Sequence, residues 1–535
     1  MTSQSWQDHA WKQEIASSAG MQGANSVGEL LARQAAAFGD RIALSMVEHE
    51  DTLTYRQLDD QVSKLASGLQ KLGVAAQDRV AVCLPNRIEY PVTWLALARM
   101  GAVAVPVNTA YTPGETESIL RDTGTRYLIL DSSQDGPPGI PPNNIVWVGK
   151  SSLTEGHSWE QLVAAGDSFF TPEREVISDD LLTIQYTSGT TGMPKGCMQP
   201  HRFWLITGFT HPANQRDRPP FQSALGEAPF FYFDGLAMLM AMLTCGGTLY
   251  QADRYSSSKF FARVRATGAE TAYLPRVWGE PDPFDRDHAL KMFTGFGLTP
   301  EIVDEVESRF GATVREAYGM TEIGPCMQVY LKDGNRAAIG TCGELSPTYE
   351  ARIVDASGRN VETGGTGELW VRGPGVIDGY WNRPEANATT FVDGWFRTGD
   401  LFVQEDSGYY RITGRIKEMI KRSGENISAH EVEGVLMRYP GVAGVAVIPV
   451  PDSYRDEEVK AVLKVRPGVD MDAIDPADIR AFCELHLASF KCPRFISVVP
   501  DLPYIRDVKV DKMSLRNVDD PRAGCWDATI GAWIS

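Results

Sequence analysis

Apolar positions in the first part of the chain change repeatedly between helical and strand spacing. Between residues 55 and 72 they recur every three or four positions, with Thr54 before them and Gly73 after them. This pattern predicts an amphipathic helix with a cap at each end. Compact apolar runs alternate with a further helical pattern, which predicts strands at residues 79–84, 101–107 and 127–131 and a helix at residues 91–100. Such alternation is typical of α/β layers.

The pattern changes after residue 414. Ser428 and Glu431 form an S-x-x-E pattern, which predicts a capping box at the start of a helix over residues 431–437. The elements predicted next are strands at residues 445–450, 459–465 and 494–499 and a helix at residues 479–487. The fold class predicted from the whole pattern is a large α/β N-terminal domain with several sheets and helices, plus a small α+β C-terminal domain.

Composition and charge narrow the functional classes. The chain has 535 residues, of which 43% are hydrophobic and 22% charged, so it has enough apolar material for several packed domains. Lys and Arg number 51 and Asp and Glu number 69, which gives a formal net charge of -18. Because this charge repels phosphate backbones, we expect no nucleic-acid partner.

Cysteine usage and hydropathy indicate the compartment. The eight cysteines form no C-x-x-C pair, as expected of free thiols in a reducing environment. The first 26 residues lack the apolar core of a secretory signal. The longest apolar runs are far shorter than the roughly 20 residues that span a bilayer. We therefore expect a cytoplasmic protein without integral membrane contact, whose oligomeric state the sequence leaves open.

The most informative stretch is YTSGTTGMPKG, residues 186–196. Glycines allow backbone N–H groups to converge on an anion, hydroxyls add donors, and Lys195 adds a positive charge, so the loop suits a polyphosphate. It is not a Walker A loop, because Pro194 and Gly196 stand where that pattern needs Gly and Ser or Thr. Taken alone, the stretch also fits a flexible turn with a solvated lysine.

This loop resembles the phosphate loop of the adenylate-forming superfamily, which contains acyl-CoA synthetases, peptide-synthetase adenylation domains and firefly luciferase. Further segments match the family's motifs in the same order: EAYGMTE at 316–322, GPGVIDGYWNRP at 373–384, GWFRTGD at 394–400, YRITGRIK at 410–417 and SGENISAHEVE at 423–433. The resemblance covers nearly the whole chain. It implies a ligase that joins a carboxylic acid to AMP and then to a thiol.

The resemblance also implies the residues that bind ATP. They are Thr187, Ser188, Gly189, Thr190, Thr191, Gly192, Lys195, Gly295, Tyr318, Thr321, Asp400 and Arg415. Tyr318 would stack on adenine, Thr321 would contact the α-phosphate, and Glu322 would hold the Mg²⁺ that accompanies ATP, since a carboxylate is a hard oxygen ligand. Asp400 and Arg415 would bind the ribose. Without the motifs, these residues read as a core tyrosine and surface charges.

The same resemblance implies how the small domain works. Lys417 stands at the family's hinge position, which gives a large domain at residues 1–416, a mobile C-terminal domain at residues 417–517 and a C-terminal tail at residues 518–535. A hinge requires tolerant backbone angles and no special side chain. Ser423, Gly424 and Glu425 would lie in the loop that meets CoA.

Residues 502–516, LPYIRDVKVDKMSLR, resemble the family's catalytic-lysine segment, and the register makes Lys509 the catalytic lysine. The segment departs from the family in two places. Val508 replaces the glycine before the lysine, and Tyr504 and Ile505 replace an Arg-Thr pair. Lys512 is therefore an alternative position for the catalytic charge. Without the motif, Lys509 reads as a solvated surface residue.

The acyl pocket of the family begins near a P-x-F-H-x-x-G segment, which PFFYFDG at 229–235 matches except for Tyr232 in place of histidine. We expect Tyr232, Phe233, Asp234 and Gly319 to meet the acid. Consecutive aromatics also fill cores, and Asp234 also fits a cap of a helix that begins at Gly235. An aspartate among aromatics favours a polar or cationic acid over a long fatty acid.

The function predicted from these observations is AMP-forming acid–thiol ligation. A carboxylate attacks the α-phosphate of Mg-ATP, and a thiol, expected to be CoA, then displaces AMP. Residues 419–433, 451–461 and 488–493 resemble the crotonobetaine/carnitine-CoA ligase branch most. Two alternatives stay open: a ligase that loads a free-standing carrier protein, and a degenerate member that binds nucleotide and serves as an interaction module. The chain ends shortly after Arg516, which disfavours an additional carrier or reductase domain.

Overall fold

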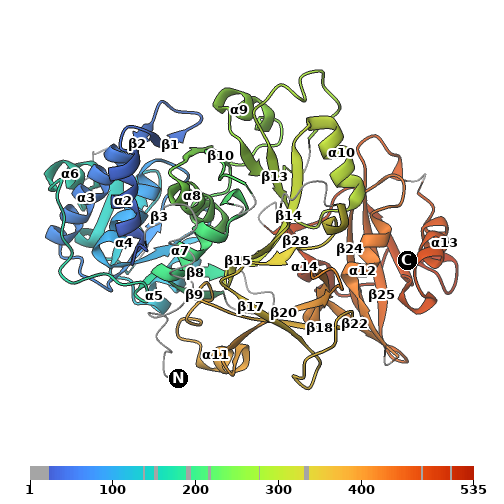
Figure 1. Cartoon of the computed structure of the whole chain (residues 1–535). Coiled ribbons are helices and arrows are strands. Elements are labelled where there is room, and N and C mark those ends of the chain that lie inside the picture. Colours follow the sequence, from blue (N-terminus) through green and yellow to red (C-terminus); the bar gives the residue numbers. More distant parts are fainter. Residues whose placement is uncertain are drawn as a thin grey trace. The chain divides into compact units, whose positions relative to one another are not determined.

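The computed structural model describes residues 23–136, 139–149, 155–187, 194–214, 218–275, 278–330, 336–423, 425–471, 474–505 and 509–534 (Figure 1). The chain forms two compact units. Unit 1 comprises residues 1–351 and 371–396, and unit 2 comprises residues 352–370 and 397–535.

The first sheet of unit 1 has seven strands in the order β7-β6-β5-β3-β4-β8-β9. The strands are β3 (Arg79–Cys83), β4 (Val103–Pro106), β5 (Tyr127–Asp131), β6 (Ile145–Val148), β7 (His157–Ser158), β8 (Leu181–Thr187) and β9 (Lys195–Pro200). All neighbours pair in parallel except β8 and β9, which form an antiparallel hairpin. Strands β3, β4, β5 and β6 are nearly continuous apolar runs, as expected where both faces of a parallel sheet are buried.

The second sheet of unit 1 has nine strands in the order β16-β15-β14-β13-β12-β10-β11-β1-β2. The strands are β1 (Ile42–Met46), β2 (Thr52–Thr54), β10 (Ser223–Gly226), β11 (Thr248–Gln251), β12 (Thr271–Tyr273), β13 (Met292–Gly295), β14 (Thr313–Met320), β15 (Gly324–Gln328) and β16 (Glu344–Leu345). Strands β10 to β14 run parallel, so their carboxyl ends meet at one edge of the sheet.

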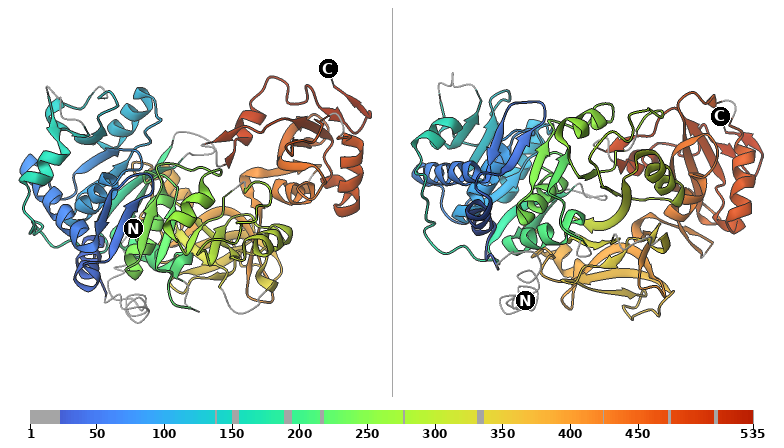
Figure 2. Two further views of the ribbon diagram at one scale, coloured as in Figure 1. Left: turned by 90° about the horizontal axis from the view of Figure 1, so that it is seen from above. Right: turned by 45° about the horizontal axis from the view of Figure 1, so that its top comes forward.

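Helices connect and cover these sheets. They are α2 (Val27–Phe38), α3 (Tyr55–Leu72), α4 (Glu89–Met100), α5 (Pro113–Thr123), α6 (Trp159–Ala165), α7 (His201–Thr210), α8 (Phe233–Cys245), α9 (Phe260–Thr267), α10 (Pro300–Phe310) and α11 (Pro384–Thr390). Figure 2 shows the blue and cyan helices beside the strands of the first sheet. Helices α4, α7 and α8 are apolar on almost all sides and buried along nearly their whole length, as expected of helices packed between layers.

The predicted helix over residues 55–72 is α3, with the same bounds. The Thr54 hydroxyl accepts from the backbone N–H of Gln57, the Gln57 side chain accepts from Thr54 N–H, and Gly73 closes the helix at φ 100°.

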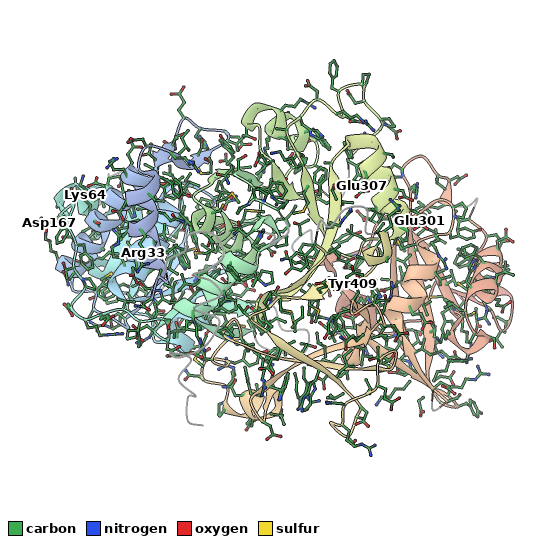
Figure 3. The ribbon with its side chains drawn as sticks, in the orientation of Figure 1. Arg33, Lys64, Asp167, Glu301, Glu307 and Tyr409 are labelled. Atoms are coloured by element: carbon green, nitrogen blue, oxygen red, sulfur yellow. The ribbon has the colours of Figure 1, made fainter. Side chains whose placement is uncertain are left out.

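The outward faces of the helices carry charge, which Figure 3 shows for Arg33, Lys64 and, on α10, Glu301 and Glu307. In α3, the local capping signals and the apolar periodicity therefore predict both ends of the helix.

A five-stranded sheet follows, in the order β17-β18-β20-β19 with β21 paired to β20. Its strands are β17 (Glu350–Val354), β18 (Thr366–Arg372), β19 (Phe391–Val392), β20 (Trp395–Gln404) and β21 (Tyr410–Arg415). The antiparallel ladder between β20 and β21 sets Asp400 directly opposite Arg415.

The C-terminal part of unit 2 is built on a seven-stranded sheet. Its strands are β22 (Met419–Arg422), β23 (Glu425–Ser428), β24 (Val442–Asp452), β25 (Asp456–Val465), β26 (Phe495–Val499), β29 (Trp526–Asp527) and β30 (Ala532–Trp533). A hairpin of β27 (Tyr504–Ile505) and β28 (Lys509–Val510) and the helices α12 (Ala429–Leu436), α13 (Pro476–His486) and α14 (Lys512–Arg516) complete it. Helices α12 and α13 pack on the apolar core of this sheet.

Helix α12 differs from the prediction in its bounds and its cap. It begins at Ala429, and the Ser428 hydroxyl accepts from the backbone N–H of Glu431 at 3.3 Å, which is half of the expected capping box. The Glu431 carboxylate instead forms an ion pair with Lys491 at 2.6 Å. A long-range cation competes with the local backbone donor, and sequence spacing does not reveal it.

Residues at the C-terminus extend the sheet. Strand β29 pairs antiparallel with β26, and β30 pairs with β29. Asp527 of β29 forms an ion pair with Arg494 at 3.0 Å, and the Cys525 thiol and Ser497 hydroxyl lie 3.0 Å apart. Figure 2 follows this segment, in red, to the C-terminus.

A buried carboxylate ties several strands of unit 2 together. Glu458 of β25 is fully buried and forms an ion pair with Arg422 at 2.6 Å and with Arg455 at 3.1 Å. Arg494 approaches it to 3.7 Å and also pairs with Asp452. One anion therefore pairs with arginines from three segments, and its removal leaves the largely buried Arg422 guanidinium without this carboxylate.

We predict that Glu458→Gln lowers the free energy of unfolding of this part of the protein by about 3 kcal/mol, because breaking a buried ion pair leaves its partners desolvated. Chemical denaturation followed by intrinsic fluorescence of the full chain measures the shift. Glu484→Gln is the matched control, since Glu484 forms an exposed i, i+4 pair with Arg480 and should change stability by less than about 0.5 kcal/mol. Equal effects of the two substitutions would contradict the structural role of Glu458.

Candidate active site

The hairpin of β8 and β9 frames the phosphate loop suggested by the sequence. Thr187 ends β8 and Lys195 begins β9, and the two residues face each other in the antiparallel register. Both are half-buried. Ser188, Gly189, Thr190, Thr191 and Gly192 lie outside the described residues. The ends of the loop are thus fixed by strand pairing.

Residues 377–381 bind along the free side of β9. Backbone N–H groups of Met198 and Trp381 donate to the carbonyls of Gly379 and Gly196 at 2.9 and 2.7 Å. Asp378 N–H donates to the Met198 carbonyl at 3.0 Å. This backbone ladder brings a segment from nearly 200 residues later in the sequence against the strand that follows the phosphate loop.

The same segment holds the acidic residue expected to bind magnesium. The Tyr380 hydroxyl donates to Oε1 of Glu322 at 3.0 Å, and Ile377 N–H donates to the Glu322 carbonyl at 3.0 Å. Burial raises the pKa of Tyr380, and the Glu322 charge raises it further, so the phenol stays protonated and can donate. Lys195 Nζ lies 4.7 Å from the centre of the Tyr380 ring, a cation–π contact.

Thr321 is held from β9 as well. Gln199 is fully buried, and its Nε2 donates to the Thr321 carbonyl at 2.9 Å. Thr321 and Glu322 form the turn between β14 and β15. The structure therefore gathers Lys195, Thr321 and Glu322 around one strand, although the sequence separates the lysine from the other two by more than a hundred residues.

Tyr318 and Gly295 lie on neighbouring parallel strands. Tyr318 is near the end of β14, and Gly295 ends β13 opposite Glu316. The Glu316 carboxylate accepts from the N–H groups of Gly297 and Leu298 at 3.0 and 3.1 Å, which fixes the turn after Gly295. A Cβ at Gly295 would lie 2.6 Å from Leu298 Cδ2, so a larger residue here would require the Leu298 side chain to move.

Unit 2 carries the two residues expected at the ribose. Asp400 is 1% exposed, and its Oδ1 forms an ion pair with Arg415 Nε at 2.6 Å. The pair joins β20 and β21 at their register position. Each side chain thus fixes the orientation of the other within unit 2. Their contact with ribose stays a prediction.

Residues expected at the hinge and at CoA also lie in unit 2. Lys417 is exposed in a 3-10 turn, Ile416–Glu418. Ser423 is exposed at φ 53°, and its N–H donates to the Arg455 carbonyl at 3.0 Å. Glu425 pairs with Arg422 across the β22–β23 hairpin, and Gly424 lies outside the described residues.

The segment expected to carry the catalytic lysine forms the β27–β28 hairpin, in which the backbone of Lys509 pairs with that of Ile505. Residues 506–508, including the atypical Val508, lie outside the described residues. Lys512, the alternative position, is engaged elsewhere: its Nζ lies 2.8 Å from Glu418 and 2.8 Å from Glu433. These two carboxylates raise the pKa of Lys512 against the opposing effect of its burial. Lys512 therefore serves as an anchor for the segment within unit 2.

The aromatic segment lies at the start of α8. Phe233 stacks on Trp204, with ring centres 5.8 Å apart, and Asn108 donates to the Tyr232 hydroxyl at 2.8 Å. The helix begins at Phe233 and not at Gly235, and no side chain caps it, so Asp234 does not serve as the helix cap. Solvent reaches Asp234, yet burial by surrounding protein raises its pKa to about 6.

Gly319 lies exposed in β14, three residues before Glu322. A Cβ at this position would lie 2.4 Å from the Gly324 carbonyl oxygen, so the tight approach of β15 requires glycine. Sequence reasoning missed three residues that hold the expected site residues in place. Tyr380 contacts Glu322, Gln199 contacts Thr321, and Glu316 fixes the turn after Gly295. The tyrosine and the glutamate both stood in recognised motifs, whereas Gln199 followed the loop without any local signal.

The described residues were also compared with the requirements for a membrane-spanning helix and for a protein-only metal site. No helix in the described ranges is long and apolar enough to cross a membrane. Within those ranges, no group of three or more His, Cys, Asp or Glu side chains could hold a metal ion. A metal that arrives with a polyphosphate needs fewer protein ligands, because phosphate oxygens and water supply the others.

Comparison with known proteins matches both parts of the chain. The sequence model of the AMP-binding enzyme family matches residues 31–381. The model of the AMP-binding enzyme C-terminal domain matches residues 431–509. Lys195, Gly295, Tyr318, Thr321 and Glu322 lie in the first region.

The chain is similar to several curated CoA ligases. It is 33% identical to a probable CoA ligase, CCL9, from Humulus lupulus, with 90% of this chain and 94% of the relative covered. It is 32% identical to an oxalate–CoA ligase from Arabidopsis thaliana, covering 90% and 96%, and 30% identical to a crotonobetaine/carnitine–CoA ligase from Salmonella heidelberg, covering 90% and 97%. These nearly equal identities do not single out one acid.

Two solved structures of related enzymes share the fold of this chain. ATP-bound MatB from Rhodopseudomonas palustris superposes with a TM-score of 0.82 at 28% identity, covering 92% of this chain and 98% of that one. An anthranilate CoA ligase, AuaEII, in complex with anthranoyl-AMP shares the fold with a TM-score of 0.82 at 23% identity, covering 92% and 96%. The chain therefore belongs to the AMP-binding enzyme family and is an AMP-forming carboxylic acid–CoA ligase.

Proposed function

We propose that this ligase positions Mg-ATP with the cluster formed by Lys195, Tyr380 and Glu322, and that the acid binds beside the first turn of α8. One observation carries the proposal: Tyr380 contacts the Lys195 ammonium through its ring and the Glu322 carboxylate through its hydroxyl. Both ends of the predicted phosphate loop lie on the hairpin that contains this cluster. A polyphosphate with its metal requires such neighbouring positive and negative groups.

In the first half-reaction, a carboxylate oxygen of the acid attacks the α-phosphorus and pyrophosphate leaves. Lys195 and the loop donors hold the phosphates, Thr321 donates to the α-phosphate, and Lys509 balances the negative charge that builds up during attack. Tyr318 stacks on adenine above Gly295. Asp400 and Arg415 hold the ribose.

Glu322 would hold the Mg²⁺ that accompanies ATP. Its carboxylate is buried next to a phenol donor, which fixes its orientation, and a carboxylate is a ligand of the hard type that Mg²⁺ prefers. The metal would neutralise phosphate charge and favour departure of pyrophosphate. The Glu322 side chain would contribute its negative charge and a fixed position for the metal.

In the second half-reaction, the thiol of CoA attacks the acyl carbonyl and AMP leaves. The C-terminal domain, residues 417–517, turns about Lys417 between the two steps. Ser423, Gly424 and Glu425 then meet CoA. Lys417 lies between the two regions that the family models match, which supports a linker role for this position.

The acid lies among Tyr232, Phe233, Asp234 and Gly319. A carboxylate at Asp234 disfavours a long apolar chain, so the acid is polar or cationic. The eight cysteines are all free thiols, which supports a reducing, cytoplasmic setting.

We predict that Tyr380→Phe raises the KM for Mg-ATP about tenfold, because Glu322 loses a hydrogen bond to its charged oxygen worth roughly 1.5 kcal/mol. Initial rates of pyrophosphate release against Mg-ATP, repeated over a range of free Mg²⁺, measure the change. Tyr127→Phe is the control, since it removes a hydroxyl that donates only to the Gly73 carbonyl in the described structure. An unchanged dependence on both Mg-ATP and Mg²⁺ would exclude the positioning role.

We predict that Lys509→Ala reduces acyl-adenylate formation by at least about a hundredfold while thioester formation from supplied acyl-AMP stays nearly intact, because the lysine charge acts only on the first transition state. Single-turnover assays of each half-reaction separate the effects. Lys512→Ala should instead lower stability through loss of its ion pairs with Glu418 and Glu433. A selective loss of adenylation in Lys512→Ala, with Lys509→Ala unaffected, would show that the register is wrong.

We predict that Lys417→Pro spares acid-dependent pyrophosphate exchange and slows CoA ligation, since proline fixes φ and restricts the preceding residue. Exchange and acyl-CoA formation are measured on the same preparation. Lys421→Pro is unsuitable as a control, because Lys421 N–H donates to Glu457, so Lys417→Ala serves instead and should leave both rates near wild type. Normal ligation by the proline variant would refute the hinge.

A further inference from the structure

Asp122 of α5 contacts the two chain segments that carry Lys195 and Tyr380, and all of these residues belong to unit 1. Its carboxylate oxygen Oδ2 accepts from the Tyr186 hydroxyl at 2.5 Å. Its backbone carbonyl accepts from the indole Nε1 of Trp381 at 3.0 Å. Tyr186 belongs to β8, which pairs with the strand that begins at Lys195, and Trp381 follows Tyr380 in the chain.

The end of helix α5 explains why the Asp122 carbonyl is available for these contacts. The last four carbonyls of an α-helix have no partner within the helix, and Asp122 is the next-to-last residue of α5. Asn382 Nδ2 donates to this carbonyl at 2.9 Å, in addition to Trp381. Asn382 has φ 50°, a left-handed conformation that asparagine adopts more readily than most residues. The turn after Tyr380 is therefore fitted to the end of α5.

The carboxylate of Asp122 is not explained by the stability of its own helix. The helix dipole opposes a negative charge near a helix C-terminus. Arg383 compensates this charge with two hydrogen bonds, from Nη1 to Oδ1 at 3.0 Å and from Nη2 to Oδ2 at 3.2 Å. The pair is mostly buried, with 22% of the Asp122 side chain and 29% of the Arg383 side chain exposed. A locally unfavourable residue that is compensated by a distant cation indicates a role in tertiary positioning.

Tyr186 relates the position of Asp122 to β9. Burial raises the pKa of Tyr186, and its hydrogen bond to Asp122 raises it further, so the phenol stays protonated and donates. Tyr186 faces Gly196 in the register of β8 and β9, and a Cβ at Gly196 would lie 3.2 Å from Tyr186 Cζ. The Gly196 carbonyl accepts from the backbone N–H of Trp381 at 2.7 Å. These contacts therefore link α5, the β8–β9 hairpin and residues 380–382 to one another.

We propose that Asp122 is a positioning residue for the terminal phosphates of ATP. Its contact with Tyr186 fixes the hairpin in which β9 begins at Lys195. Its contact with Trp381 fixes the residue that follows Tyr380. The distance between the Lys195 ammonium and the Tyr380 ring therefore depends on Asp122. This inference rests on the proposed role of that ammonium and that ring in binding Mg-ATP.

The test compares two nucleotides on the full-length enzyme in the absence of any acid, so that no acyl-adenylate forms. Isothermal titration calorimetry measures Kd for Mg-ATP and for AMP, which lacks the two terminal phosphates and their metal. Asp122→Asn keeps the volume of the side chain but leaves one acceptor oxygen for Tyr186 and Arg383. We expect Kd for Mg-ATP to rise about tenfold and Kd for AMP to change less than about twofold. Equal changes in the two constants, or an unchanged Kd for Mg-ATP, would overturn the inference.

A second variant tests the route through the phenol. Tyr186→Phe removes only the hydroxyl and should weaken the binding of Mg-ATP to a similar degree, again without an effect on AMP. Because the two substitutions break the same hydrogen bond, the double variant should exceed the larger single effect by less than about twofold. If the two single effects multiply, Asp122 does not act through Tyr186 and the inference fails.

Asp180→Asn is the matched control. Asp180 precedes β8 at its other end and accepts from Arg174 Nη1 and Nη2 at 2.8 and 2.9 Å, a pair of the same kind. Its substitution should lower the melting temperature and leave the ratio of the two Kd values unchanged. The same rise of this ratio in the control would show that any damage to β8 produces it, and the specific role of Asp122 would be wrong.

Tyr380→Phe separates this inference from the proposed ATP site and is titrated in the same way. If Tyr380→Phe leaves Kd for Mg-ATP unchanged, the proposed cluster is wrong and this inference falls with it. If Tyr380→Phe weakens Mg-ATP while Asp122→Asn and Tyr186→Phe bind it normally, the cluster stands and the positioning role of Asp122 is wrong.

Discussion

The backbone ladder between β9 and residues 377–381 is the constraint on which the cluster of Lys195, Tyr380 and Glu322 depends. Each hydrogen bond of this kind contributes roughly 1 kcal/mol net, and three of them fix a segment that has no other regular pairing on that side. The ladder places Tyr380 above Lys195 and against Glu322. Strand pairing therefore controls the spacing of a cation and an anion more firmly than either side chain could.

Sequence reasoning recovered what local signals encode. The bounds and both caps of α3 followed from apolar spacing, Thr54 and Gly73. The family followed from motifs that are contiguous in the chain. The half-formed cap of α12 shows the limit, because Lys491 draws the Glu431 carboxylate away from the helix N-terminus. No local pattern reports an ion pair that closes over 60 residues.

The residues that hold the expected site residues in place were also not predicted from local sequence patterns. Gln199 holds Thr321, and Asp122 holds Tyr186, through contacts between elements that pack together only in the folded chain. Glutamine in a strand and aspartate in a helix are ordinary at the sequence level. Their roles depend on which donor faces which acceptor, and that information resides in the tertiary arrangement.

The C-terminal strands have a consequence for solubility. Strand β26 is covered on one side by β25 and on the other by the two-residue strand β29, which itself carries the equally short β30. Without residues 518–534, β26 would become an edge strand whose Phe495 and Ile496 backbone groups face outward. Long unpaired edges recruit strands from other molecules, whereas very short ones offer few backbone groups for such pairing. The final residues thus act as a shield against edge-to-edge aggregation.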